Sequence, residues 1–192
     1  MPSHPKDVAN EIIDLMTRAG GARYFGEAVS QLEHAEQCAW RAREAGADEE
    51  LVLAALLHDI GHLLESEFAE RDERVGVINH DDLGAAWLLE RGFSRRFARL
   101  VGGHVDAKRY LTATNPAYLE RLSPASRETL RLQGGPMTAE EAGAFALDPD
   151  HGDMLRLRAW DEMAKDPAWR GPGIETYRGT LIRYLEELRA FA

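Results

Sequence analysis

Cysteine is almost absent from this sequence, because Cys38 is the single cysteine among 192 residues. One thiol cannot form an internal disulfide, which excludes a disulfide-stabilised extracellular scaffold and favours a reducing, cytoplasmic location. Long apolar runs are also missing, since no segment approaches the roughly 18 apolar residues that cross a bilayer. The first residues lack the pattern of a signal peptide. We therefore expect no membrane partner.

Positive charge is scarce as well. Lys and Arg number 23 against 33 Asp and Glu, which gives a formal net charge of −10. Binding to a phosphate backbone relies on an excess of lysine and arginine, so nucleic acid is not an expected partner. An anionic small molecule is still allowed, because a pocket can be locally cationic inside an acidic surface.

Apolar–polar alternation with a period of two is rare, whereas apolar residues recur at spacings of three and four. The predicted fold class is all-α, a helical bundle that forms a single domain over residues 1–192. The longer predicted helices cover 8–16, 30–45, 80–91, 94–110, 154–165 and 174–191, with a central apolar helix after Asp48. Shorter helices are predicted after Asn115, Ser123 and Thr138. We expect residues 65–79 to form an exposed loop and glycines 102–103 to make a helix irregular.

The central segment, residues 53–64, carries an unusual group of polar side chains. His58 and Asp59 are adjacent and His62 follows His58 by four residues, so a continuing helix would present both histidines on one face. Burying two imidazoles and a carboxylate is costly unless they are paired or bind a cation. For this segment alone, a core histidine bonded to a carboxylate is the simpler interpretation.

Further residues of metal-ligand type lie on other predicted helices. His34 lies on the helix before the central one, and helices joined by a short connection are usually neighbours. Asp161 is the best candidate for a carboxylate from a distant helix, because its own helix is apolar around it. With His80 and His104 added, the candidate ligands are too many for one ion. Either they are ordinary histidines, or Asp59 bridges two ions.

Three of these helices also carry a potential cation three or four residues from the predicted ligand: His62, Lys108 and Arg158. Three converging cations would repel one another without an anion among them, and phosphate or phosphonate suits such a group. For any one of them a solvated surface charge is the simpler interpretation, which the recurrence on three helices weakens. Tyr24 and Glu27 could reach the same pocket, where Glu27 would attract a substrate ammonium group.

The order His34, His58-Asp59, Asp161 fits the H…HD…D pattern of the HD-domain superfamily. Longer segments resemble the PhnZ-type mixed-valent diiron oxygenases: YFGEAVSQLEH, AALLHDIGH, GHVDAKRYL, LSPASRETLRLQGGPM and RAWDE. These segments lie between about residues 24 and 162. The resemblance therefore covers most of the chain and implies a single HD domain.

The resemblance implies two iron ions, Fe(II) and Fe(III), with O2 as co-substrate. One iron would be held by His34, His58, Asp59 and Asp161, and the other by His80, His104 and the bridging Asp59. Members of this family cleave the carbon–phosphorus bond of a 1-hydroxy-2-aminoethyl-type phosphonate. The expected partner is therefore a small organophosphonate, and the expected products are phosphate and glycine or, from a trimethylated substrate, glycine betaine.

The same resemblance assigns the substrate contacts. Tyr24 would occupy the open iron position at rest, and Glu27 would receive the substrate amine and displace the tyrosine. The phosphonate would be contacted by the remaining candidates: His62, Lys108, Ser126 and Arg158. The sequence leaves open whether the nitrogen is a primary amine or trimethylated, which metal is bound, and the oligomeric state.

Three alternatives stay open. A metal-dependent HD phosphohydrolase would activate water against a small phosphate monoester, although that reaction gives Tyr24 and Glu27 no evident role. A polyol oxygenase similar to myo-inositol oxygenase fits less well, because Glu27 suggests a cationic substrate group. A metal-stabilised binding module without activity would close its coordination, whereas the ligand count here leaves positions open.

Overall fold

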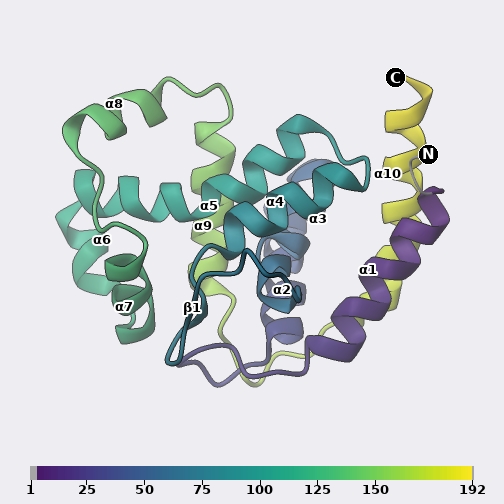
Figure 1. Ribbon diagram of the computed structural model, residues 1–192, viewed down its shortest axis with the longest axis horizontal. Coiled ribbons are helices and arrows are strands. Elements are labelled where there is room, and N and C mark those ends of the chain that lie inside the picture. The colour runs from purple at the N-terminus through teal and green to yellow at the C-terminus, as the bar shows by residue number, and fades with distance from the viewer. Residues whose placement is uncertain (1–3, 192) are drawn as a thin grey trace.

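The computed structural model describes residues 4–191 and confirms the all-α fold class (Figure 1). The α-helices are, in chain order, α1 (Pro5–Ala19), α2 (Gln31–Glu44), α3 (Glu49–Leu57), α4 (His80–Glu90), α5 (Arg95–Thr114), α6 (Pro116–Arg121), α7 (Pro124–Leu132), α8 (Ala139–Ala146), α9 (His151–Met163) and α10 (Arg178–Ala190). Two 3₁₀ helices, η1 (Ile60–Leu63) and η2 (Ile174–Tyr177), and a hairpin of β1 (Arg71–Asp72) and β2 (Gly76–Val77) complete the described chain. No helix within residues 4–191 is both long and apolar enough to traverse a membrane.

Helix α3 forms the centre of the bundle. Every residue from 51 to 57 is buried, and a helix that is apolar on all sides is stable only when other elements surround it. Helices α2, α5, α9 and α10 all pack against α3. In Figure 1, α1 and α10 lie side by side at one end of the molecule, and α6, α7 and α8 lie at the other.

Side-chain caps fix where the helices begin. Ser30 and Glu33 form the predicted capping box, with the Ser30 amide donating to Glu33 Oε2 at 2.8 Å. The Asp48 carboxylate accepts from the Leu51 amide at 2.8 Å and opens α3. A second capping box at Thr138 opens α8. These starts agree with the predicted ones, because each cap satisfies amides that have no partner inside the helix.

The central helix ends earlier than the sequence pattern predicts. Helix α3 stops at Leu57, His58 caps it, and His62 lies in the 3₁₀ helix η1. The chain turns here because Gly61 packs against the first residue of α4: a Cβ at position 61 would lie 1.9 Å from the carbonyl oxygen of His80. The prediction that a continuing helix places His58 and His62 on one face is therefore wrong. Instead, the His62 ring stacks on the His80 ring, with 3.9 Å between their centroids.

Two further local predictions are corrected. Helix α5 runs through glycines 102–103 without interruption, and Gly103 serves close packing, since a Cβ there would lie 2.4 Å from Met154 Sδ on α9. The segment 65–79 is not wholly an exposed loop, because it contains the β1–β2 hairpin and buries Val75 and Val77. The hairpin leads directly into His80.

The segment that carries Tyr24 and Glu27 is not helical. Its ends are joined by a bridge between Arg23 and Ser30, and the Glu27 amide donates to the Tyr24 carbonyl at 3.1 Å. This turn keeps the Tyr24 and Glu27 side chains in the lining of one cavity. At the other end of the chain, the predicted helix over 174–191 is split into η2 and α10.

Candidate metal centre and substrate cavity

Four histidines and two aspartates meet in the interior of the bundle. They come from α2, the end of α3, α4, α5 and α9, and each is at most 6 % exposed: His34, His58, Asp59, His80, His104 and Asp161. The structure thus brings together all six residues predicted as metal ligands. Their side chains form two groups that share one carboxylate.

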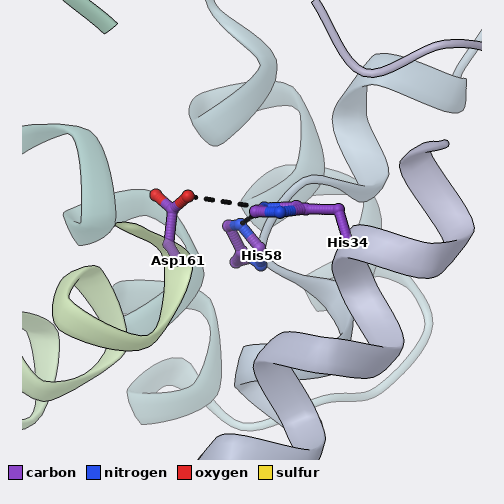
Figure 2. Close-up of side chains that lie close together, drawn as sticks. All are labelled: His34, His58 and Asp161. Carbon is purple, nitrogen blue, oxygen red and sulfur yellow. Dashed lines mark hydrogen bonds and ion pairs between the residues drawn. The ribbon is translucent and has the colours of Figure 1, made fainter. Parts of the chain in front are cut away.

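The first group joins α2, the end of α3 and α9, and Figure 2 shows three of its side chains, His34, His58 and Asp161, pointing toward one another. His34 Nε2 lies 3.2 Å from His58 Nε2 and 3.4 Å from Asp161 Oδ1. Asp59 Oδ2 lies 3.3 Å from His58 Nε2 and 3.6 Å from His34 Nε2. Two imidazole nitrogens and two carboxylate oxygens therefore surround one position.

The second group joins the start of α4 and the middle of α5. His80 Nε2 and His104 Nε2 lie 3.1 Å apart. The other oxygen of the shared carboxylate, Asp59 Oδ1, lies 3.2 Å from His80 Nε2 and 3.4 Å from His104 Nε2. The two oxygens of Asp59 consequently face two different histidine pairs.

The backbone sets the tautomer of all four histidines. The Nδ1 atoms of His34, His58, His80 and His104 lie 2.9, 2.9, 3.1 and 2.6 Å from the carbonyl oxygens of Ala164, Ala55, Val77 and Val101. A carbonyl oxygen only accepts, so each Nδ1 carries a proton, and a ring that holds no second proton presents a lone pair at Nε2. Lone pairs that face each other at about 3 Å repel unless a cation lies between them. The same orientation by a carbonyl is typical of metal-binding histidine.

Two buried carboxylate oxygens also lack partners. Asp59 Oδ2 and Asp161 Oδ1 accept no hydrogen bond from any residue between 4 and 191. With no metal bound, burial raises the pKa of the Asp59 carboxyl, but the charge of a protonated His58 beside it outweighs burial and holds that pKa well below its usual range. An ionised, buried and unpartnered oxygen is costly. A metal ion would supply the missing partner, so the donor set fits two ions.

A narrow cavity of about 50 Å³ opens beside these two groups. Its wall contains every residue predicted as a substrate contact: Tyr24, Glu27, His62, Lys108, Ser126 and Arg158. The volume is small compared with the several hundred Å³ typical of sites for drug-sized ligands. The cavity therefore suits a compact ligand.

Tyr24 covers the first group. Its ring stacks on the His34 imidazole, with 4.0 Å between the centroids and 15° between the planes. Burial, followed by the negative charges of Asp59 and Asp161, raises the Tyr24 pKa well above its usual value. The phenol is therefore protonated unless a cation stabilises its anion.

Lys108 projects from α5 into the cationic side of the cavity. Its Nζ donates to Thr129 Oγ1 at 3.0 Å and to Gln133 Oε1 at 2.5 Å, and the residue is only 3 % exposed. Burial, followed by repulsion from Arg158, lowers the Lys108 pKa to about 7. Sequence reasoning missed Thr129 and Gln133, although both lie in one of the segments that carry the family resemblance.

Arg158 directs most of its donors at protein groups. Its Nε donates to the Tyr118 hydroxyl at 2.9 Å, its Nη1 donates to Asp161 Oδ2 at 2.5 Å, and its Nη2 pairs with Glu162. Arg158 thereby turns Asp161 so that Oδ1 faces His34. Ser126 lies beside the same group, with its hydroxyl 3.5 Å from Glu162 Oε1. A direct contact from Arg158 or Ser126 to a phosphonate stays a prediction.

Glu27 has a partner that the sequence did not reveal. Lys165 Nζ lies 3.0 Å from Glu27 Oε1, and both residues line the cavity. Lys165 follows the end of α9, beyond the last recognised motif. No periodicity or spacing singles it out.

Comparison with known proteins agrees with this site. The model of the HD domain family matches residues 31–148. Over 156 residues the chain is 42% identical to [1-hydroxy-2-(trimethylamino)ethyl]phosphonate dioxygenase (glycine-betaine-forming) of Leisingera caerulea, covering 79% of this chain and 76% of that protein. Over 183 residues it is 36% identical to hydroxymethylphosphonate dioxygenase of Gimesia maris, covering 95% and 90% of the two chains.

An uncharacterised protein of Acanthamoeba polyphaga mimivirus is 40% identical over 179 residues, which cover 93% of this chain and 82% of that protein. The matches to the two dioxygenases extend over most of both partners, so the predicted resemblance to the PhnZ-type oxygenases is confirmed. The chain belongs to the HD-domain family, in the group that contains the phosphonate dioxygenases.

Proposed function

We propose that this protein uses O2 to cleave the carbon–phosphorus bond of a 1-hydroxy-2-(amino or trimethylammonio)ethylphosphonate, giving phosphate and glycine or glycine betaine. The observation that carries the proposal is the arrangement of the cavity. Two groups of metal-ligand type share Asp59 at its base, and the cationic Lys108 and the anionic Glu27 line its wall. A small substrate matches this distribution of charge if its phosphonate binds Lys108 and its ammonium takes the place of the Lys165 ammonium on Glu27.

Atom balance defines the reaction. The carbon–phosphorus bond breaks, the carbinol carbon gains one oxygen and becomes a carboxyl group, and phosphorus gains one oxygen and leaves as phosphate. The two added atoms equal one O2. The carbinol carbon loses the four electrons that reduce O2, so no external reductant is consumed. The same balance holds for hydroxymethylphosphonate, which has no amine.

The donor set supports two iron ions as the cofactor. His34, His58, Asp59 and Asp161 would hold one, and His80, His104 and the second oxygen of Asp59 would hold the other. When bound, the iron pair supplies the activation of O2 and a Lewis acid for the substrate oxygens. The backbone carbonyls that fix each Nδ1 keep the ligand nitrogens aimed at the metal positions.

The residues of the wall bind and orient the substrate. The Lys108 ammonium and a neutral His62 would donate to the phosphonate oxygens; burial, followed by the charge of His80, lowers the His62 pKa well below its usual value. Arg158 keeps Asp161 turned toward the first metal position. At rest, Tyr24 would occupy the open position beside that metal and keep water out of the empty pocket, and it would leave when substrate enters.

A comparison of matched substrates tests the proposal. Iron-reconstituted protein is offered 1-hydroxy-2-aminoethylphosphonate, its trimethylammonio analogue, hydroxymethylphosphonate and the monoester 2-aminoethyl phosphate, under air and under argon. We expect phosphate from at least one hydroxyphosphonate under air and none under argon. Release of phosphate from the monoester under argon would instead support an HD phosphohydrolase.

A further inference from the structure

Lys165 lies in the substrate cavity, yet the proposed reaction gives it no task. Its Nζ is 3.0 Å from Glu27 Oε1, and the side chains of Lys165 and Glu27 are only 16 % and 17 % exposed. That oxygen of Glu27 is buried and accepts no geometrically sound hydrogen bond from the residues that the structure describes. The contact is therefore an ion pair without good hydrogen-bond geometry.

The backbone around Lys165 is held firmly against α2. On one side, the carbonyl of Ala164 pairs with His34 Nδ1 at 2.9 Å. On the other, the Asp166 amide donates to Gln37 Oε1 and the Asp166 carbonyl accepts from Gln37 Nε2, both at 3.0 Å. Lys165 is thus held between two fixed contacts, one of which also orients a candidate metal ligand.

The Lys165 ammonium is the same chemical group as the primary ammonium of an aminated substrate. A carboxylate that is already paired with a lysine attracts a second cation less strongly, because binding must break the first pair or bring two cations together. With the pair intact, the Glu27 side of the cavity is electrically neutral. A neutral wall favours a substrate that has no amine.

We propose that Lys165 determines substrate specificity by occupying the position on Glu27 that a substrate ammonium would take. This inference rests on the proposed function, because it concerns the choice among hydroxyphosphonates. In this protein, an aminated substrate must displace Lys165 from Glu27, whereas hydroxymethylphosphonate binds with the pair closed. Lys165 thus lowers the preference for amines that Glu27 alone would give.

Equilibrium binding to the iron-reconstituted protein without oxygen tests this inference. Calorimetry gives the dissociation constants of 1-hydroxy-2-aminoethylphosphonate and hydroxymethylphosphonate for the wild type, Lys165→Met and Lys165→Gln. In both variants we expect the preference for the aminated compound over hydroxymethylphosphonate to rise about tenfold, the scale of one hydrogen bond to a charged group. Lys165→Arg keeps the cation and should keep the wild-type preference, as should Lys6→Met at an exposed site.

The pair is isolated by repeating the measurement in a Glu27→Gln background. There, Lys165→Met should leave the preference unchanged, because no carboxylate remains to be released. Equal weakening of both compounds in Lys165→Met would mean that Lys165 binds the phosphonate, and an unchanged preference would mean that it binds neither group; either result overturns the inference. If the wild type binds and turns over none of the hydroxyphosphonates, the proposed function itself fails.

Discussion

At the scale of single residues, histidine tautomers determine what the buried groups can bind. Each Nδ1 of the four buried histidines faces a backbone carbonyl, so each Nε2 offers a lone pair to the interior. Together with the two oxygens of Asp59, these lone pairs form two positions that favour a cation. The backbone carbonyls that contact Nδ1 thus determine which nitrogen of each histidine is available to a cation.

Lys108 gives a residue-scale prediction for affinity. Replacing it with alanine removes a buried ammonium that would bind the phosphonate, so we expect Lys108→Ala to weaken substrate binding by about 1.5 to 3 kcal/mol. Calorimetry without oxygen measures the change, and metal analysis shows that the ions are still bound. An unaltered dissociation constant would remove Lys108 from the phosphonate site.

The lowered pKa of Lys108 adds a pH dependence. With a pKa of about 7 in the free protein, Lys108 is charged below that pH and must take up a proton to bind a phosphonate above it. Affinity should therefore fall by up to about tenfold for each pH unit above pH 7. The Lys108→Ala variant is the control, because it retains the ionisation of the substrate but loses this slope. Parallel profiles for the two proteins would contradict the assignment.

Sequence reasoning anticipated much of the site at this scale. The six predicted ligand residues converge because four lie on buried helix positions and His58 and Asp59 directly follow the buried helix α3, although their role as ligands stays a prediction. Lys165 could not be anticipated, since a lysine beyond a helix end is usually solvated. It turns inward because Ala164 and Asp166 are held by α2, and these contacts join residues far apart in the sequence.

At the scale of elements, the helix starts that carry a side-chain cap could be predicted, whereas the end of the central helix could not. Caps at Ser30, Asp48, Ser94 and Thr138 use local side-chain chemistry that a short stretch of sequence displays. The end of α3 at Leu57 instead depends on the approach of Gly61 to His80, which is a tertiary contact. Glycines in the sequence can mark either a break in a helix or close packing between helices, and in α5 they mark close packing.

Gly103 gives the element-scale prediction. A Cβ at this position would lie 2.4 Å from Met154 Sδ, so Gly103→Ala must displace the buried Met154 side chain or push α9 away from α5. We expect the free energy of unfolding to fall by about 1 to 3 kcal/mol, the usual cost of overpacking. Denaturant unfolding measures it, and Gly152→Ala, at an exposed helical position with open space, is the control. Equal stabilities of the two variants would contradict close α5–α9 packing.

At the scale of the whole molecule, an acidic chain places cationic side chains in its interior. The chain carries a formal net charge of −10, yet Lys108, Arg158 and Lys165 line the cavity. These cationic side chains suit a small anion. The buried His and Asp groups come from α2, α4, α5 and α9, so bound metal would connect these helices.

Removal of metal should therefore destabilise the entire fold. Two ions, each present at about a thousandfold above its own dissociation constant, together contribute about 8 kcal/mol, which corresponds to about 16 to 32 °C in a domain of this size. We expect chelated protein to unfold at a temperature lower by about that amount in circular dichroism, with recovery on adding ferrous iron. An unchanged midpoint in protein shown to have lost two ions would contradict the fit of this donor set to metal.

The stoichiometry of one turnover reaction tests the central claim most directly. Ferrous-reconstituted protein is given the best hydroxyphosphonate in a sealed vessel, and O2 uptake and phosphate are measured together. The proposed atom balance predicts one O2 consumed for each phosphate released and no phosphate after O2 is exhausted. Phosphate released without O2 uptake, from protein that holds two irons, would contradict the oxygenase and favour hydrolysis.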